Sequence, residues 1–322
     1  MPPRADILRP TRRATLLGAA CLCCLPPASL AAQGISPGAN PGVAEVSPGV
    51  FVRRGPDTEA SPANLDGIAN TGFVIGRDAV LVTDPGGSRA DGAWLRAEIR
   101  ARTDRPIRHV VISHVHPDHA FGAGAFLDDA PEFVGHAALA PALAARGEFY
   151  RQRLAEILGP EATGPVVMPT KSVGTEGATI DLGGRQLLLR AHPTAHTTCD
   201  LSVLDPEAGL LFPADLLFVG RVPSLDGSLV GWLAELDALE ALAARHAVPG
   251  HGPTLVEPGP AIAALRRYLL ALRDGTRAAI AAGQPIGAAA ATVAAGEREN
   301  WALFDDYNGR NVTQAYKELE WE

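Results

Sequence analysis

The chain has 322 residues, of which 47% are hydrophobic and 20% are charged, and its formal net charge is −8. These proportions are typical of a globular protein and argue against disorder over most of the length. No apolar run approaches the roughly 20 residues that a bilayer-spanning helix needs, and the acidic balance makes a phosphate-backbone binder a poor interpretation.

The first 31 residues have the pattern of an export signal. Four arginines precede an apolar stretch at 16–25, and small residues follow at 28–32. This is the order of the charged, apolar and cleavage-site regions of a secretory signal. The segment 11–17 resembles a twin-arginine signal, which exports folded proteins. An ordinary secretory signal with an incidental arginine pair is the alternative, and a lipoprotein signal at Cys21 fits less well because the apolar stretch before it is short.

Cleavage after residue 31 would change the charge and the cysteine content of the protein. It removes four arginines and one aspartate, so the net charge would become −11. It also removes three of the four cysteines and leaves only Cys199, so no intramolecular disulfide can form even in an oxidising compartment. We therefore expect a soluble periplasmic protein that binds no nucleic acid and does not insert into the membrane after processing.

After a Gly- and Pro-containing linker at 32–44, the chain alternates predicted strands and helices. Strands are predicted at 50–53, 68–75, 79–83, 108–113, 186–191, 201–204 and 209–212. Helices are predicted at 93–102, 141–158, 232–245, 261–274 and 312–319. This alternation indicates an α/β layered fold in one domain over 45–322, with a helical tail from about residue 258. Loops at strand ends are then the places where chemistry is expected.

Three histidines and an aspartate lie within six residues, where the predicted strand at 108–113 ends. Side chains at i and i+2 of an extended segment point the same way, so His114 and His116 can converge on one ion. Asp118 and His119 follow Pro117 and can turn toward a second ion. Imidazole nitrogen and carboxylate oxygen suit Zn²⁺, or alternatively Fe or Mn. Because a buried strand leads directly into this cluster, a metal site is a better interpretation than a solvated polar cluster.

The segment His-Val-His-Pro-Asp-His at 114–119 resembles the H-x-H-x-D-H motif of the metallo-β-lactamase superfamily. Four further motifs follow the family's pattern in order, around Asp84 in Leu-Val-Thr-Asp, His196 in Thr-Ala-His-Thr, Asp215 in Phe-Pro-Ala-Asp and His251 in Pro-Gly-His-Gly. The resemblance covers roughly residues 45–256. It implies the four-layer αβ/βα sandwich, in which two mixed sheets pack face to face with helices outside.

The resemblance also implies the role of each matching residue and a cofactor of two Zn²⁺ ions. Two ions about 3.5–4 Å apart share a hydroxide, lower its pKa and polarise a substrate oxygen. Asp118 would be the catalytic residue that also orients the attacking hydroxide, and Asp84 would hold ligands in place through hydrogen bonds. The implied ligands are His114, His116 and His196 for metal one, Asp118, His119 and His251 for metal two, and Asp215 as the bridge.

The aspartate at position 215 distinguishes branches of this superfamily. β-Lactamases of the fold have Cys or Ser there, so the chain is more similar to the glyoxalase II-like and general hydrolase branches. The segments 64–70, 192–197 and 220–228 are similar to those of quinoprotein relay system zinc metallohydrolases. Those are exported proteins associated with pyrroloquinoline-quinone-dependent dehydrogenases. That resemblance implies a physiological setting and a quinoprotein partner system, and it does not imply a substrate.

The ligand set predicts an exported metal-dependent hydrolase acting on an ester, thioester, lactone or related bond of a small molecule. Three alternatives remain open. One is an iron-dependent sulfur dioxygenase of the same fold, because His and Asp ligands serve iron as well as zinc. The others are a β-lactamase and a non-catalytic metal-binding accessory protein that serves a quinoprotein.

Several residues near the motifs receive a weaker interpretation. His192 and His136 are expected to have structural roles, and Cys199 to be a small buried hydrophobic residue rather than a ligand. Arg221 either binds a substrate carboxylate or phosphate or forms a surface ion pair. The aromatic residues of the tail are expected to pack on the domain rather than to bind ligand; they are Trp301, Phe304, Tyr307, Tyr316 and Trp321.

Overall fold

The computed structural model describes residues 42–322, so the expected export signal at 1–31 and most of the expected linker at 32–44 lie outside the described residues. The strands form two sheets, one of seven and one of five strands. The first contains, in spatial order, β1 (Ala44–Ser47), β2 (Val50–Arg53), β3 (Thr71–Ile75), β4 (Val80–Thr83), β5 (Ile107–Ile112), β6 (Glu132–His136) and β7 (Lys171–Val173). The second contains β12 (His246–His251), β11 (Leu210–Phe218), β10 (Leu201–Asp205), β9 (Gln186–Ala191) and β8 (Ala178–Asp181).

Both sheets are mixed. The strands from β1 to β4 pair antiparallel and those from β4 to β7 pair parallel. In the second sheet only the β11–β12 pair is parallel. The carboxyl ends of β4, β5, β11 and β12 consequently provide loops at which functional side chains can gather.

Apolar side chains on the facing surfaces of the two sheets form the central core. In β9 the alternation is direct, because Leu187, Leu189 and Ala191 are buried while Gln186 and Leu188 are exposed. A strand that alternates in this way covers the core with one face only. By contrast, all nine residues of β11 are buried, since helices cover its other face.

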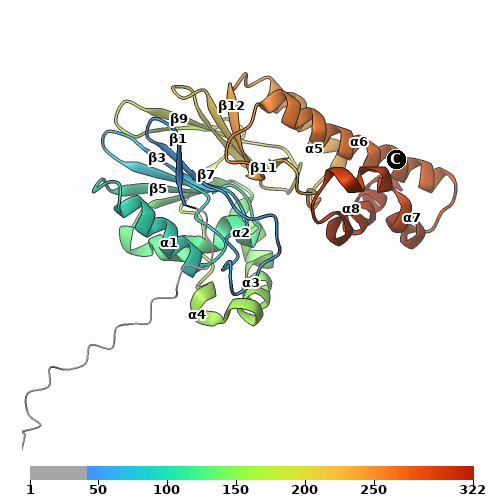
Figure 1. Cartoon of the computed structure of the whole chain (residues 1–322), viewed down its shortest axis with the longest axis horizontal. Helices are drawn as coiled ribbons and strands as arrows, with labels where there is room; N and C mark the ends of the chain where they lie inside the picture. The colour runs from blue at the N-terminus through green and yellow to red at the C-terminus, as the bar shows by residue number, and fades with distance from the viewer. Residues whose placement is uncertain (1–41) are drawn as a thin grey trace, which may run out of the picture. The chain divides into compact units, whose positions relative to one another are not determined.

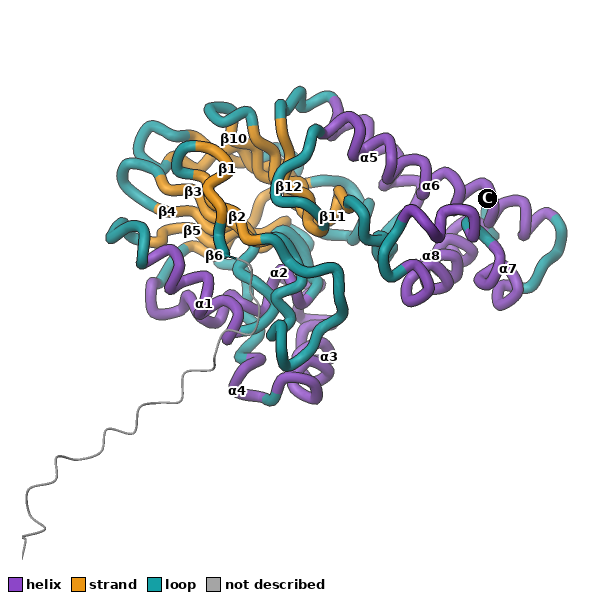
Figure 2. The backbone as a smooth tube through the Cα atoms, in the orientation of Figure 1, coloured by secondary structure: helices purple, strands orange, loops and turns teal. Residues whose placement is uncertain are grey.

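Helices cover the outer faces of the sandwich (Figures 1 and 2). Those packed with the first sheet include α1 (Arg89–Arg100), η2 (Phe121–Asp129) and α3 (Leu139–Leu158), with α2 (Pro117–Ala120) and α4 (Pro160–Thr163) nearby. The second sheet is covered by α5 (Leu229–Glu240) and α6 (Pro258–Ala281), which pack with α7 (Ile286–Thr292), η3 (Ala295–Asn300) and α8 (Phe304–Leu319). The predicted αβ/βα sandwich is confirmed. Within 42–322, no helix is long and apolar enough to cross a membrane.

The predicted strands and helices agree best with the structure where a single sequence periodicity dominates. The expected strands at 50–53 and 186–191 match β2 and β9 residue for residue. The expected helix at 93–102 begins earlier, at Arg89, because the Ser88 side chain accepts a hydrogen bond from the Asp91 amide and caps the helix. The helices expected at 261–274 and 312–319 are also longer than predicted, whereas the one expected at 232–245 ends at Glu240.

The prediction of a strand at 68–70 was wrong, because this segment is a turn that wraps the end of β12. Just before this segment, Leu65 and Asp66 have positive φ angles of 54° and 62°, which are turn conformations and not extended backbone. The side-chain amide nitrogen of Asn70 donates hydrogen bonds to the carbonyl oxygens of Pro249 (2.8 Å) and Gly252 (3.2 Å). The segment therefore fixes the position of the β12 end instead of extending the first sheet.

A buried ion pair fixes the loop between β4 and α1. The side chains of Arg53 and Asp91 are both 0% exposed, and the two guanidinium Nη atoms contact the two carboxylate oxygens. Asp91 also accepts a hydrogen bond from the Gly87 amide at 3.1 Å. Since this loop begins with Asp84, the pair holds one of the residues expected at the metal site.

Replacing one partner of this pair should destabilise the fold strongly. In Arg53→Met, Asp91 would remain buried without its counter-charge, and we expect the free energy of unfolding to fall by about 3–5 kcal/mol. Denaturant unfolding measures this change. The double variant with Asp91→Leu should recover much of the loss, because it leaves no unpaired charge. As a control, Arg77→Gln removes one partner of the exposed Arg77–Asp78 pair and should have no measurable effect on stability. An equal loss in this control would contradict the stabilising role given to the buried pair.

Candidate metal centre

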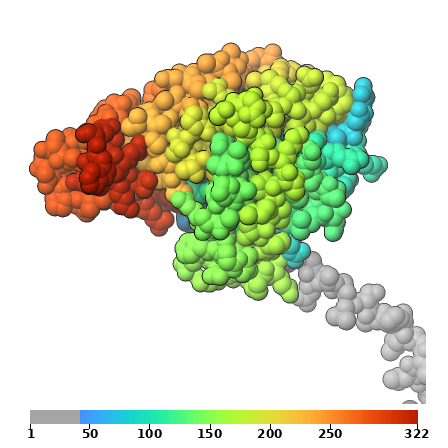
Figure 3. Space-filling view, turned by 180° about the vertical axis from the view of Figure 1, so that it is seen from behind, coloured from blue at the N-terminus to red at the C-terminus, as the bar shows by residue number. Residues whose placement is uncertain are grey.

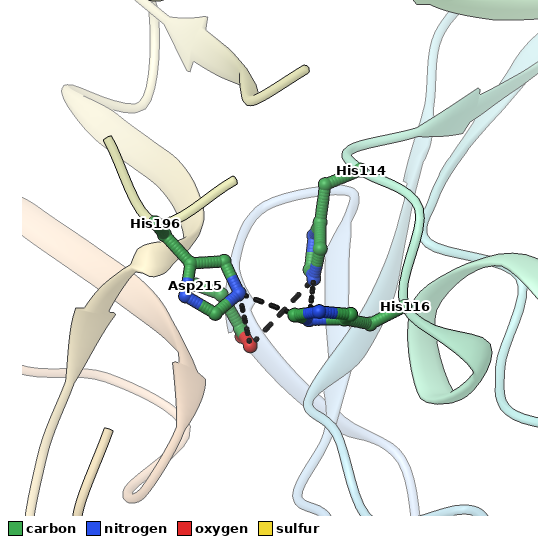
Figure 4. A group of neighbouring side chains, drawn as sticks. All are labelled: His114, His116, His196 and Asp215. Carbon is green, nitrogen blue, oxygen red and sulfur yellow. Dashed lines mark hydrogen bonds and ion pairs between the residues drawn. The ribbon is translucent and has the colours of Figure 1, made fainter. Parts of the chain in front are cut away.

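The seven expected ligands, distant in sequence, meet at one edge of the two sheets. They lie after β5 (His114, His116), on α2 (Asp118, His119), in the β9–β10 loop (His196), in β11 (Asp215) and at the end of β12 (His251). The structure places them in two groups, and within each group the candidate ligand atoms lie within 4.8 Å of one another. Figure 4 shows the first group, in which the side chains of His114, His116, His196 and Asp215 point toward one another. The second group consists of Asp118, His119 and His251.

Ring nitrogens converge in the first group. The Nε2 atoms of His114 and His196 each lie 3.1 Å from Nδ1 of His116. The Oδ2 atom of Asp215 lies 3.7 Å from the His114 nitrogen and 3.4 Å from the His196 nitrogen. In the second group, Nε2 of His251 lies 3.2 Å from Oδ2 of Asp118.

Hydrogen bonds on the far side of the rings determine which nitrogen carries the hydrogen. Ser113 Oγ donates to Asp84 Oδ2 at 2.9 Å, so it accepts from His114 Nδ1, also at 2.9 Å. The Nδ1 atom of His119 donates to the same Asp84 oxygen at 2.8 Å. For His116, Nε2 donates to Asp226 Oδ2 at 3.3 Å. Each of the three rings thus presents an unprotonated nitrogen to the centre, as carboxylate–histidine–metal arrangements require.

The central donor atoms lack hydrogen-bond partners of their own. Nε2 of His119 and Oδ1 of Asp215 are both buried without a partner, although they lie only 3.0 Å apart. Two electron-pair donors at this distance repel each other unless a proton or a metal cation lies between or beside them, and buried polar atoms are rarely left unsatisfied. The residues therefore fit a site for metal cations of the type that nitrogen and oxygen ligands hold.

The pKa values of the histidines in the two groups also fit a metal site. Burial lowers the pKa of His114 well below its usual value and that of His196 to about 3, so both rings are neutral, as metal ligands must be. Burial acts in the same direction on His119, but the carboxylates of Asp215, Asp118 and Asp84 outweigh it and raise its pKa well above the usual value. The carboxylates of the second group thus attract positive charge, which a metal cation would supply in place of the ring proton on Nε2 of His119.

Two cavities adjoin the candidate ligands. One, of about 180 Å³, is lined by Asp118 and His251 together with Ile68, Arg221 and Tyr307. The other, of about 500 Å³, is bordered by His116, Tyr150, Asp226, Arg310 and Lys317, among others. His116 and Ser224 border both. Because Tyr307, Arg310 and Lys317 belong to α8, this helix forms part of the wall of the space beside the candidate ligands; Figure 3 shows the C-terminal part of the chain in orange to red.

The family model of the metallo-β-lactamase superfamily matches residues 65–251, more than half of the chain. The chain belongs to this superfamily. No curated protein matches the sequence.

Solved structures of superfamily members have the same fold. A metallo-β-lactamase from Pontibacter korlensis superposes with a TM-score of 0.58 at 19% identity, covering 71% of this chain and 98% of that chain. The stereoselective inverting sec-alkylsulfatase Pisa1 from Pseudomonas sp. superposes with a TM-score of 0.66 at 18% identity. That match covers 86% of this chain but only 50% of the alkylsulfatase, so this chain matches half of that protein's length. At these identities the similarity shows the fold alone.

The residues with weaker interpretations have defined environments in this superfamily member. His192 is buried and its two ring nitrogens contact Glu235 Oε2 and Ser202 Oγ, both at 2.7 Å, away from the ligand groups. Cys199 is fully buried, and burial raises the pKa of its thiol to about 11. His136 is half-buried and accepts a hydrogen bond from the Ala138 amide. These contacts agree with the structural roles expected for the three residues.

Two expectations need correction. Arg221 is not a surface residue, because it is only 4% exposed and lies beside His251, although its Nη2 atom lies 3.8 Å from the carboxylate of the exposed Glu59. The tail aromatics do not all pack in the same way. Trp301 and Phe304 are buried, but Trp321 is 85% exposed and Tyr307 lines the smaller cavity.

Sequence reasoning gave no role to Ser113 or Asp226, and it expected Tyr307 only to pack on the domain. Ser113 adjoins the histidine motif, and a hydroxyl beside a ligand is the signal that could have suggested its role. Asp226 lies in the segment 220–228 that carried the finer family resemblance, but its contact with His116 joins residues that are far apart in sequence. Nothing in the sequence around Tyr307 indicates that α8 reaches the metal centre.

Asp84 should control metal affinity without being a ligand. It has a φ of 55°, which Asn tolerates, and its carboxylate accepts from His119 Nδ1 and from the Ser113 amide and hydroxyl. In Asp84→Asn an amide group replaces one acceptor oxygen, so we expect zinc affinity to fall about 10- to 100-fold. Competition with a chromophoric chelator measures it. Asp78→Asn, on the exposed surface, is the matched control; unchanged affinity in Asp84→Asn would refute this role.

Asn311 of α8 holds the segment 220–228, which carries Arg221 and Asp226. Its 1% exposed side chain donates to Pro223 O (2.7 Å) and accepts from the Leu225 amide (2.9 Å). Asn311→Ala would leave both buried groups unsatisfied, so the free energy of unfolding should fall by about 2–4 kcal/mol. Thermal or denaturant unfolding measures the loss, and the exposed Asn300→Ala is the control. If the free energy of unfolding falls no more in Asn311→Ala than in Asn300→Ala, other contacts hold the segment 220–228.

Proposed function

We propose that the protein is a two-metal hydrolase that cleaves an ester, thioester, lactone or related bond of a small molecule. The observation that carries this proposal is the position of the Asp215 carboxylate between the two groups. Its Oδ2 faces His114 and His196, while its Oδ1 lies 3.0 Å from Nε2 of His119 and 3.5 Å from Nε2 of His251. One oxygen for each group is the arrangement of a bridging ligand, and paired metal sites serve hydrolytic displacement.

The surrounding residues support a hydrolytic role. Two bound metal ions would supply a hydroxide at neutral pH and polarise the substrate oxygen that accepts charge. Asp118 lines the smaller cavity, so its carboxylate can accept and hold the proton of the attacking nucleophile. Apolar side chains of Ile68 and Val222 line the same cavity and limit the access of water to the bound substrate.

Zinc is the metal that we propose, because imidazole and carboxylate are ligands that suit it. The same donor set also serves iron, which would correspond to the sulfur dioxygenase alternative. The Fe:Zn ratio of the purified protein and oxygen uptake with a persulfide distinguish the two. β-Lactam hydrolysis is disfavoured. β-Lactamases of this fold have Cys or Ser at the position where this chain has Asp215.

We also propose that the protein is exported and serves a quinoprotein dehydrogenase system. Support comes from the signal-like residues 1–31 and from the three segments that resemble quinoprotein relay system metallohydrolases. Two of these segments lie at the site: 64–70 wraps the β12 end, and 220–228 contributes residues to both cavities. Mass spectrometry of the protein from a periplasmic fraction tests export, since the N-terminus should begin near residue 32.

Metal binding and turnover should depend on each other. We expect about two transition-metal ions per chain after gentle purification. Chelation should abolish hydrolysis of any active member of a panel of carboxylic esters, thioesters, lactones and sulfate esters, and Zn²⁺ should restore it. Elemental analysis and steady-state assays measure both. Fewer than about one ion per chain, or turnover that survives chelation, would count against a two-metal hydrolase.

Asp118 should be needed for turnover but not for folding. In Asp118→Ala we expect kcat to fall by about 10²- to 10⁴-fold, the contribution typical of a positioned base. Circular dichroism should show retained structure, and the exposed Asp237→Ala should keep wild-type activity. Abolished turnover with an intact fold would exclude a non-catalytic accessory protein, whereas an unaffected kcat would remove Asp118 from the proposed mechanism.

A further inference from the structure

Arg221 differs from the other buried arginines among residues 42–322. Three arginines are buried there, and two of them pair with a buried aspartate. Arg53 pairs with Asp91, and Arg185 donates from Nε to Asp205 at 2.9 Å. Arg221, which is 4% exposed, has no carboxylate within hydrogen-bond distance. A buried guanidinium without a directly hydrogen-bonded carboxylate is costly, so its environment favours a closer anionic partner.

The acceptors around the Arg221 guanidinium are few and distant. The nearest carboxylate oxygen, Oε1 of Glu59, is 3.8 Å away on a side chain that is 55% exposed. That oxygen already accepts a hydrogen bond from the Tyr307 hydroxyl at 2.7 Å. The Tyr307 oxygen itself lies 3.5 Å from Nη2, at the limit of a hydrogen bond.

The contact with His251 does not satisfy the guanidinium either. Nη1 of Arg221 lies 3.1 Å from Nδ1 of His251. Because Nε2 of His251 faces Asp118 and Asp215, its hydrogen belongs on Nδ1, which donates to the Ile68 carbonyl oxygen at 3.2 Å. A ring nitrogen that carries a hydrogen cannot accept one, so Nη1 lacks an acceptor at this contact.

The position of Arg221 identifies what its partner would be. Its side chain lines the cavity of about 180 Å³ that also contains Asp118 and His251, beside the second ligand group. A guanidinium matches the two oxygens of a carboxylate, sulfate or phosphate group, and the Tyr307 ring, 5.7 Å from the guanidinium carbon, borders the same space. We propose that Arg221 binds a non-reacting oxyanion group of the substrate, so the preferred substrates are anionic small molecules.

This inference rests on the proposed hydrolytic function and narrows it to a substrate class. A pair of esters that differ only in one remote group tests it, with a carboxylate in one and the primary amide in the other. The metal-loaded wild type should prefer the carboxylate. In Arg221→Gln, kcat/KM for the carboxylate ester should fall about 10- to 100-fold, mainly through KM, because a charge-assisted hydrogen bond is lost. The amide ester should change less than about 3-fold.

Two further variants sharpen the comparison. Arg221→Lys keeps the charge but not the planar pair of donors, so it should retain part of the preference for the carboxylate ester. Arg277→Gln removes an exposed arginine of α6 that pairs with Glu322, and it should leave both esters unaffected. A sulfate and a phosphate in place of the remote carboxylate then show which oxyanion the cavity prefers.

The outcomes separate this inference from the proposed function. Equal losses for both esters in Arg221→Gln, or a wild type without preference, would overturn the oxyanion site while leaving the hydrolase intact. If the wild type hydrolyses neither ester, the oxyanion site is tested by binding alone, through thermal stabilisation of the metal-loaded protein by benzoate and by benzamide. Stabilisation by benzoate alone, lost in Arg221→Gln, would support the oxyanion site even though hydrolysis failed, and equal stabilisation by both would overturn it. Metal content and melting temperature of each variant exclude misfolding.

Discussion

The bridging position of the Asp215 carboxylate is the constraint on which the functional part of the structure depends. Two sets of imidazole nitrogens face its two oxygens in a buried space, and without positive charge between them these donors repel one another. Only a rigid framework can hold such a set, and the strand ends of β5, β11 and β12 supply it. Folding therefore gathers a set of donor atoms that bound metal ions would stabilise, so metal loading and stability would be linked.

The histidine cluster after β5 could be predicted from the sequence because its information is local, whereas His196, Asp215 and His251 came from the family resemblance. The i, i+2 spacing of His114 and His116 and the burial of the preceding strand can be read without knowing any long-range contact. The hydrogen bonds that orient the rings are a different matter. Asp226 reaches His116 from a loop far along the chain, and only the packing of the two sheets brings them together. Residues of this kind carry no signature in a single sequence.

The same distinction explains the errors in the predicted elements. Ile68 and Ala69 continue the apolar pattern of β3, but the turn that contains Leu65 and Asp66, with their positive φ angles, and the contacts of Asn70 with β12 override that pattern. Periodicity predicts α6 and α8, but it predicts neither α7 nor the position of Tyr307 and Arg310 beside the ligand groups. Helical spacing shows which face of α8 is apolar, and it does not show which part of the protein that face meets.

The border that α8 forms along both cavities separates two tasks between two parts of the chain. The sandwich supplies the candidate metal ligands, whereas α8 supplies Tyr307 to the smaller cavity and four lining residues to the larger one. Under the proposed function, exchanges at α8 positions that line the cavities would alter which molecules are accepted, while the residues that would hold the ions stay unchanged. A lineage with this arrangement can acquire new substrates through changes in one peripheral helix, without rebuilding its reactive centre.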